Sequence, residues 1–245
     1  ILPVGSVEQH GPHLPVGCDT VNAEAVALEA ARRVQDPPVL VLPPLWYGYS
    51  PHHMGFAGTV TLQVTTFIDV LCQVGESVLR HGVRRLILLN GHGGNVDALG
   101  VAVARLGEAW AGRARVVGIT YWHLVTRRIG EVRESPVGGM AHACEFETSL
   151  QLALCGHLVR REHARASYPA SPSPGAVRDL FDGSPIKLYD DFRSITPSGV
   201  LGDPTLASEE KGRRILAMCT EELARFITAF AEWPVGQPPG APAGL

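Results

Sequence analysis

The sequence predicts a single α/β domain with a mostly parallel central sheet covered by helices on both faces. Three observations support this fold class. The length of 245 residues fits one large domain of this kind. Short, continuously apolar runs alternate along the chain with longer amphipathic segments, as in sheets that are buried on both faces. Hydrophobic residues make up 45% of the chain, which is enough for a sizeable core.

The individual elements follow from this alternation. The expected strands are residues 1–4, 39–42, 85–89 and 115–120, and the second of them is stopped by two prolines. The expected helices are residues 20–34, 66–81, 96–110, 145–155 and about 205–230. Asp19 or Thr20 is placed to cap the first helix, and Thr66 with Asp69 forms a weaker variant of a capping box at the second. We expect the domain to span residues 1–233, followed by a flexible, Pro/Gly-rich tail at 234–245.

The composition argues against several classes of protein. With 24 acidic and 21 basic residues the net charge is −3, so the chain lacks the basic surface of a nucleic-acid binder. No stretch is apolar enough to span a membrane, and the start does not resemble a signal peptide. The five cysteines are scattered and form no CxxC pair, which argues against a zinc ribbon or a disulfide framework. A reducing cytoplasm is the simplest location.

The loop after the first expected strand carries the first candidate metal ligands. Glu8 and His10 are two residues apart, so they point the same way in an extended segment, and Asp19 follows at the mouth of the next helix. For Asp19 alone, helix capping is the preferred interpretation. The three side chains together, among glycines and prolines, favour a first-row divalent metal that accepts nitrogen and oxygen ligands.

A second loop, Asn90–Asn95, leaves the third expected strand and is rich in glycine, with His92 as its only imidazole. Its glycine spacing does not match a dinucleotide or phosphate loop, and no Gly-x-Ser-x-Gly elbow is present. Ligands of such sheets lie beyond the carboxyl ends of the strands, so the two loops are expected to meet.

The segment Met140–Ser149 opens a further expected helix and carries His142, Glu145 and Glu147. For Glu145, a favourable interaction with the helix dipole is a sufficient explanation. His142 and Glu147 stand out because the rest of the segment is small and apolar.

These motifs resemble the creatininase (creatinine amidohydrolase) family. The resemblance rests on Val4–Pro15 with Asp19, on Asn90–Asn95, on His142–Ser149 and on Gly199–Pro204, and it covers residues 1 to about 230. It implies a three-layer α/β/α fold, a dinuclear centre of zinc, manganese or iron, and an oligomer that is commonly a hexamer.

By matching position, the resemblance also implies roles for the site residues. Asp19 would bridge the two metals, Glu8 and His92 would complete one site, and His10 would belong to the other. Creatinine-cleaving members carry a glutamate at the position of Gly94. We therefore assign the fifth ligand to Glu147, with Glu145 as the alternative.

Catalysis is expected to involve His142 and Glu147. Water held between two metal ions has its pKa lowered from about 15.7 to roughly 7, so hydroxide would attack a substrate carbonyl at neutral pH. His142, which matches the position of the proposed general acid/base, would then protonate the leaving group. A small pocket for the substrate is expected to be lined by Trp46, Tyr47, His52, His53 and Trp122.

The bond that is cleaved stays open at this point, because Gly94 puts creatinine itself in doubt. We expect hydrolysis of a C–N amide bond in a small polar molecule such as a cyclic amide or formamide. A keto-inositol ring-opening hydrolase and a peptidase of the mycofactocin precursor are alternatives within the family. A metal-binding assembly subunit without activity, and a nucleotide-binding protein using Asn90–Asn95, are alternatives outside it.

Overall fold

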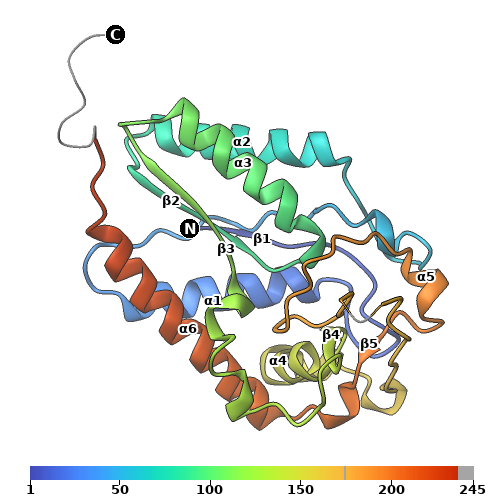
Figure 1. Cartoon of the computed structure of the whole chain (residues 1–245). Coiled ribbons are helices and arrows are strands. Elements are labelled where there is room, and N and C mark those ends of the chain that lie inside the picture. Colours follow the sequence, from blue (N-terminus) through green and yellow to red (C-terminus); the bar gives the residue numbers. More distant parts are fainter. Residues whose placement is uncertain (174, 237–245) are drawn as a thin grey trace.

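A parallel sheet between two layers of helices forms the body of the protein (Figure 1). The computed structural model describes residues 1–173 and 175–236. The sheet has the order β1-β2-β3, and its strands are β1 (Leu2–Val4), β2 (Arg85–Asn90) and β3 (Arg115–Thr120). Helices α2 (Val64–Arg80) and α3 (Val96–Ala109) cover one face, and α1 (Cys18–Arg33) and α6 (Glu209–Ala231) cover the other. The three-layer α/β/α fold that was predicted is therefore confirmed.

Each face of the sheet has its own hydrophobic core. Between the sheet and helices α2 and α3, the buried side chains include Phe67, Leu71, Leu86 and Leu106. On the other face, Val26, Leu89, Ile215 and Leu223 pack with residues of α4. Because both faces are covered, β2 reads as a nearly continuous apolar run, which is why its sequence predicted a buried strand.

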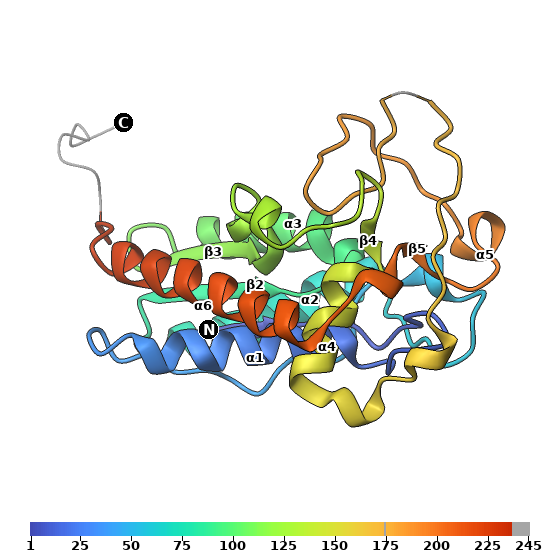
Figure 2. The same cartoon turned by 90° about the horizontal axis from the view of Figure 1, so that it is seen from below.

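A smaller region, of which the sequence predicted only helix α4, lies beyond one end of the sheet. It contains β4 (Met140–His142), α4 (Glu145–Cys155), α5 (Phe192–Ile195) and β5 (Leu201–Gly202). Strands β4 and β5 pair antiparallel. Figure 2 shows the segment between α4 and β5 extending beyond the three layers.

Three local predictions were wrong. Residues 39–42 do not form a strand. The backbone N–H of Leu42 still donates to Ile1 O, and that of Leu45 donates to Pro3 O, at 2.9 Å each. The prolines between Leu42 and Leu45 lack a backbone donor, so only an isolated bridge between Leu45 and Val4 remains.

The predicted caps were wrong as well, because the helices begin at other residues. Helix α1 starts at Cys18 after Gly17, so Asp19 lies in the first turn instead of at the cap. Helix α2 starts at Val64, which leaves no capping box at Thr66. Helix α6 starts four residues later than expected, where Ser208 accepts a hydrogen bond from Lys211 N.

The strand register determines where the site forms. Val4 of β1 is opposite Asn90 of β2, and Gly91 N donates to Val4 O at 2.8 Å. Strands β1 and β2 therefore end side by side at the carboxyl edge of the sheet, and the two loops singled out in the sequence begin next to each other.

Among the described residues, no helix combines the length and the apolar character needed to cross a membrane. Residues 237–245, most of the predicted tail, lie outside the described residues.

Candidate metal centre

Four polar side chains converge at the carboxyl edge of the sheet. Glu8 and His10 come from the loop after β1, Asp19 from the first turn of α1, and His92 from the loop after β2. All four are buried, and the most exposed of them, His92, is 3% exposed. Burying so many ionisable groups costs several kcal/mol per uncompensated charge, on the order of the whole stability of a domain, so the cluster needs compensating charges.

Asp19 lies between the two histidines. Its Oδ1 is 3.1 Å from His10 Nε2, and its Oδ2 is 3.1 Å from His92 Nδ1. The same His92 nitrogen is 3.1 Å from Glu8 Oε2. Each oxygen of Asp19 therefore faces a different histidine, as expected for a carboxylate that bridges two ligand sets. Had Asp19 capped helix α1, its side chain would have been turned to backbone amides instead.

Hydrogen bonds on the outer sides of the two rings determine their tautomers. His10 Nδ1 is 3.2 Å from Glu8 O, and His92 Nε2 is 3.1 Å from Tyr49 O. Because a carbonyl oxygen only accepts, each of these nitrogens donates, and the opposite nitrogen of the neutral ring carries a lone pair. Both lone pairs thus face carboxylates. A cation is needed between each lone pair and the carboxylate that it faces. A histidine that ligates metal usually donates its other ring N–H to a carbonyl or carboxylate, as both rings do here.

Without a metal ion, protons supply that charge. Burial lowers the pKa of His92, but Glu8 and Asp19 raise it to a net value of about 10. Burial likewise lowers the pKa of His10, whereas Cys18 and Asp19 raise it well above its usual value. Burial raises the pKa of Glu8, yet His53 and His92 bring it well below its usual value. A divalent ion would displace these protons.

The donor set and its unsatisfied atoms fit a metal ion. Within the described residues, His10 Nε2 and Asp19 Oδ2 are buried and have no hydrogen-bond partner. Such atoms are rare in folded proteins and call for a ligand. The groups Glu8–Asp19–His92 and His10–His142–Glu147 each bring their ligand atoms within 4.8 Å of one another. Mixed nitrogen and oxygen donors suit first-row divalent metals.

The two glutamates at the start of α4, of which the sequence favoured Glu147, face different partners. Glu147 Oε2 accepts a hydrogen bond from Ala143 N at 2.5 Å, and its Oε1 is 3.8 Å from His10 Nε2. Ala143 has a φ of 50°, a strained value for a residue with a Cβ, which is tolerated here beside the cluster. Glu145 instead points away, and its Oε1 lies 2.6 Å from Lys211 Nζ.

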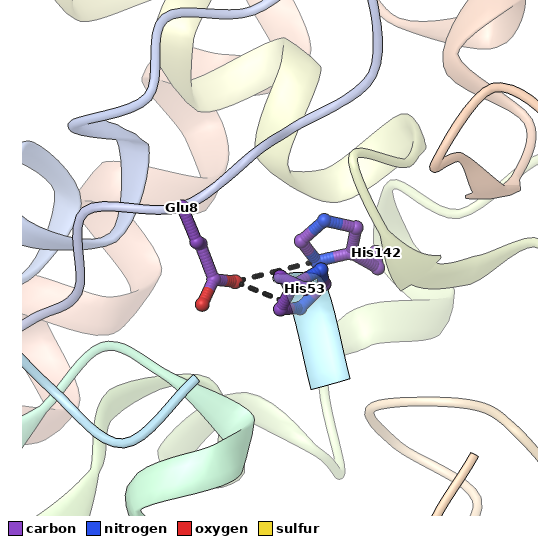
Figure 3. A group of neighbouring side chains, drawn as sticks. All are labelled: Glu8, His53 and His142. Carbon is purple, nitrogen blue, oxygen red and sulfur yellow. Dashed lines mark ion pairs between the residues drawn. The ribbon is translucent and has the colours of Figure 1, made fainter. Parts of the chain in front are cut away.

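His53 and His142 both face the Glu8 carboxylate (Figure 3). His53 Nε2 is 3.2 Å and His142 Nδ1 is 3.8 Å from Glu8 Oε1. The Gln9 amide, whose Oε1 accepts from Gly11 N, places its Nε2 2.8 Å from His53 Nδ1. His53 therefore accepts at Nδ1 and carries its hydrogen on Nε2, facing Glu8, where it acts as a positioning group.

Two further side chains, neither of them among the predicted site residues, lie beside the cluster. Ser50 Oγ donates to Glu8 Oε2 at 2.7 Å and lies 3.0 Å from His92 Nε2. Phe192, at the start of α5, lies with its ring centroid 4.1 Å from that of His53 and 5.2 Å from that of His142. Nothing in residues 165–198 indicated that this segment reaches the site, since a single phenylalanine there carries no pattern.

Of the predicted pocket residues, His52 and His53 lie at the cluster. His53 is buried at the cluster, and the ring of His52 stacks on that of His92 at 5.5 Å. Trp46 and Tyr47 are about half exposed, at 43% and 48%. Trp122 is not brought to the cluster, because it lies in the core, packed edge-on against Tyr121.

The backbone at Gly94 leaves no room for a side chain. A Cβ on Gly94 would lie 2.5 Å from both Tyr49 O and His92 Nε2 and 2.6 Å from His52 Cε1. The neighbouring Gly93 faces open space. The ring of His52 thus occupies the space that a larger residue at position 94 would need.

Gly94→Ala is therefore expected to displace His92 and destabilise the protein by about 1–3 kcal/mol, as overpacking does. Gly93→Ala is the matched control and should change the free energy of unfolding by less than about 1 kcal/mol. Chemical denaturation and metal analysis of both variants would check this. Equal stability and metal content in the two variants would contradict the steric argument.

Comparisons with known proteins agree with this geometry. The family profile described as Creatininase, creatinine amidohydrolase, matches residues 1–227. Three curated relatives align with almost the whole chain. The mycofactocin precursor peptide peptidase of Mycobacterium tuberculosis is 35% identical, covering 96% of this chain and 87% of its own. The creatinine amidohydrolase of Pseudomonas putida is 33% identical (93% and 87%), and the 3-dehydro-scyllo-inosose hydrolase of Thermotoga maritima is 32% identical (98% and 80%).

Solved creatininase structures share the fold. A manganese form superposes with a TM-score of 0.77 at 33% identity, covering 93% of this chain and 89% of that chain. A Zn–Zn form of a creatininase mutant gives 0.76 at 32% identity, with 93% and 88% covered. The chain belongs to the creatininase family and is a hydrolase of the amidohydrolase type.

Proposed function

We propose that this enzyme uses two divalent metal ions, held by Glu8, His10, Asp19, His92 and Glu147, to hydrolyse a C–N amide bond in a small polar substrate. The observation that carries the proposal is the position of Asp19, whose two oxygens each lie 3.1 Å from a different buried histidine. Glu8 and His92 would complete the ligand set on one side, and His10 and Glu147 on the other. Zinc, manganese and iron all suit these donors.

Bound there, the ions would supply a water activated at neutral pH and polarise the carbonyl of the substrate. The protein's own residues then position and protonate the reactants. Ser50 and His53 orient the Glu8 carboxylate through its two oxygens. This orientation matters because a ligand displaced by a fraction of an ångström loses much of its effect.

His142 is suited to move the proton. Its Nε2 donates to Gln9 O at 2.8 Å, so the lone pair on Nδ1 faces the cluster. Burial, together with His10 and His53, lowers its pKa well below the usual value, so the ring enters the reaction neutral. It can accept a proton from the attacking water at Nδ1 and deliver it to the leaving nitrogen, yielding a carboxylate and an amine.

Gly94 argues against creatinine as the substrate and favours a different amide. The creatinine-cleaving enzymes resembled by this chain carry a glutamate where it has Gly94, and the contacts of Gly94 leave no space for one. Peptide bonds, which the mycobacterial relative's name indicates for that protein, are also C–N amides. A keto-inositol, suggested by the name of the Thermotoga relative, would be cleaved at a C–C bond by the same activated water. A hexamer, which the family resemblance implies, stays a prediction.

Removing the metal is the first test. Dialysis against a chelator should abolish hydrolysis, and Zn²⁺ or Mn²⁺ should restore it and raise the melting temperature, because the ions bind only the folded site. The panel should contain cyclic amides, formamides, short peptides and keto-inositols. Full activity in folded, metal-stripped protein would refute the proposal. Metal binding without turnover on any of these substrates would instead support a non-catalytic assembly subunit.

A further inference from the structure

A sulfur atom lies beside the His10 half of the cluster. Cys18, the first residue of α1, is 0% exposed and directly precedes Asp19. His10, Cys18 and Asp19 form a group whose ligand atoms all lie within 4.8 Å of one another. The other half of the cluster, Glu8 with His92, offers no sulfur donor among these groups of the described residues.

An unsatisfied nitrogen points into this group. His10 Nε2 is fully buried and without a hydrogen-bond partner among the described residues, and it lies 3.1 Å from Asp19 Oδ1. In the neutral ring this nitrogen carries a lone pair, which the Asp19 carboxylate, itself an acceptor, cannot satisfy. A metal ion shared by His10, Asp19 and the neighbouring Cys18 sulfur would satisfy all three groups.

A buried chain of amides orients the sulfur. Asn22 Nδ2, one turn along α1, is 3.5 Å from Cys18 Sγ. The Asn22 amide is held in that orientation because its Oδ1 accepts from Gln151 Nε2 of α4 at 2.8 Å. Both amide side chains are at least 99% buried. An N–H donor directed at a cysteine sulfur stabilises the thiolate form that binds metal.

We propose that Cys18 Sγ is a ligand of the ion on the His10 side, with Asn22 and Gln151 as positioning residues. This inference rests on the proposed function. On coordination, the S–H proton leaves to the buffer and the sulfur forms a bond to the ion, with no change of oxidation state. The two metal sites would then differ in the type of ligand that they offer, and so in the metal ions that they prefer. The His10 side, with sulfur, favours Zn²⁺ or Co²⁺, whereas the Glu8–His92 side, with only nitrogen and oxygen, accepts Mn²⁺.

Cobalt substitution tests the proposal without relying on activity. The Co²⁺ form of the wild type should show a sulfur-to-cobalt charge-transfer band in the near ultraviolet. The band should disappear in Cys18→Ser, and the affinity for Co²⁺ should fall by about 10- to 100-fold. Cys144→Ser is the matched control, since Cys144 is also fully buried and its Sγ lies 3.8 Å from Glu147 Oε2. This variant should keep the band.

The outcomes separate the inference from the proposed function. Co²⁺ binding without a sulfur band in the wild type overturns the role of Cys18 and leaves the metal centre intact. A band that survives in Cys18→Ser, or vanishes in Cys144→Ser, also overturns it. Failure to bind Co²⁺, Zn²⁺ or Mn²⁺ at all overturns both. If Cys18→Ser does not fold, X-ray absorption spectroscopy of the wild-type zinc form tests the proposal instead, because a sulfur ligand gives a Zn–S distance of about 2.3 Å. Absence of that distance overturns the role of Cys18.

Discussion

Asp19→Asn is expected to abolish turnover, with a loss of about a thousandfold or more in kcat/KM, while the fold survives. The amide keeps the shape of the side chain but removes the charge that lies 3.1 Å from both His10 and His92. One neutral oxygen cannot replace a carboxylate that faces two ligand sets. Metal analysis should show that ions are lost from both sides of the cluster, together with the loss of activity.

Asp97→Asn provides a matched control for this change. Asp97 also lies in the first turn of a helix that follows a strand and loop, but it is exposed and pairs with Lys187 at the surface. Such pairs contribute about 0–1 kcal/mol, so this variant should retain its metal and its activity. If Asp19→Asn still binds two ions per chain and turns over normally, Asp19 is not the bridging ligand.

Glu147→Gln and Glu145→Gln should have opposite consequences, although the two residues are only two positions apart. Glu147 Oε1 faces His10, so its replacement should reduce metal content and lower turnover by about a hundredfold or more. The amide oxygen can still accept from Ala143 N, so the stability of the metal-free protein should change little. Metal analysis, kinetics and denaturation of both variants would check this.

Glu145→Gln should instead cost stability. The carboxylate is fully buried, pairs with Lys211 at 2.6 Å and accepts from the backbone amides of Glu134 and Ser135. Among the described residues, removing its charge leaves Lys211 with only the exposed Glu134 as an ionic partner, and breaking a buried pair costs about 3 kcal/mol. A variant that is as stable as the wild type but poor in metal would show that Glu145, and not Glu147, is the fifth ligand.

The fold class was predictable because its signals are local. Strand β2 is apolar at every position from Leu86 to Leu89, and the amphipathic helices on either side repeat with helical periodicity. Helices α3 and α4 were predicted within one residue of their observed bounds. The boundaries that failed depend on proline positions and on the residues at which the caps form, as with Ser208, which lies inside the predicted helix and caps the start of α6.

The candidate ligands were predictable in part. Glu8, His10, Asp19 and His92 stand in two Gly-rich loops that follow strands, and parallel strands bring such loops to one edge of a sheet. Phe192 could not be found in this way, because it reaches the cluster from a distant segment with no motif. Ser50 lies within the segment predicted to line the pocket, but its contact with Glu8 was not predicted. The sequence favoured Glu147 over Glu145 but supplied no geometric reason for it, since both residues occupy the first turn of the same helix.

The sequence by itself determined the layered α/β fold, the hydrolase family and the residues that could ligate metal. These properties depend on hydrophobic periodicity and on the order of side chains along short segments. Only the tertiary structure decided which side each ligand faces, which histidine nitrogens carry hydrogen, and that Cys18 lies beside His10. Those features depend on contacts between α1, α4 and the strand ends. Successive residues of a helix point in directions about 100° apart, so the side chains of Cys18 and Asp19 leave α1 in different directions. No local pattern specifies how those helices are rotated against each other.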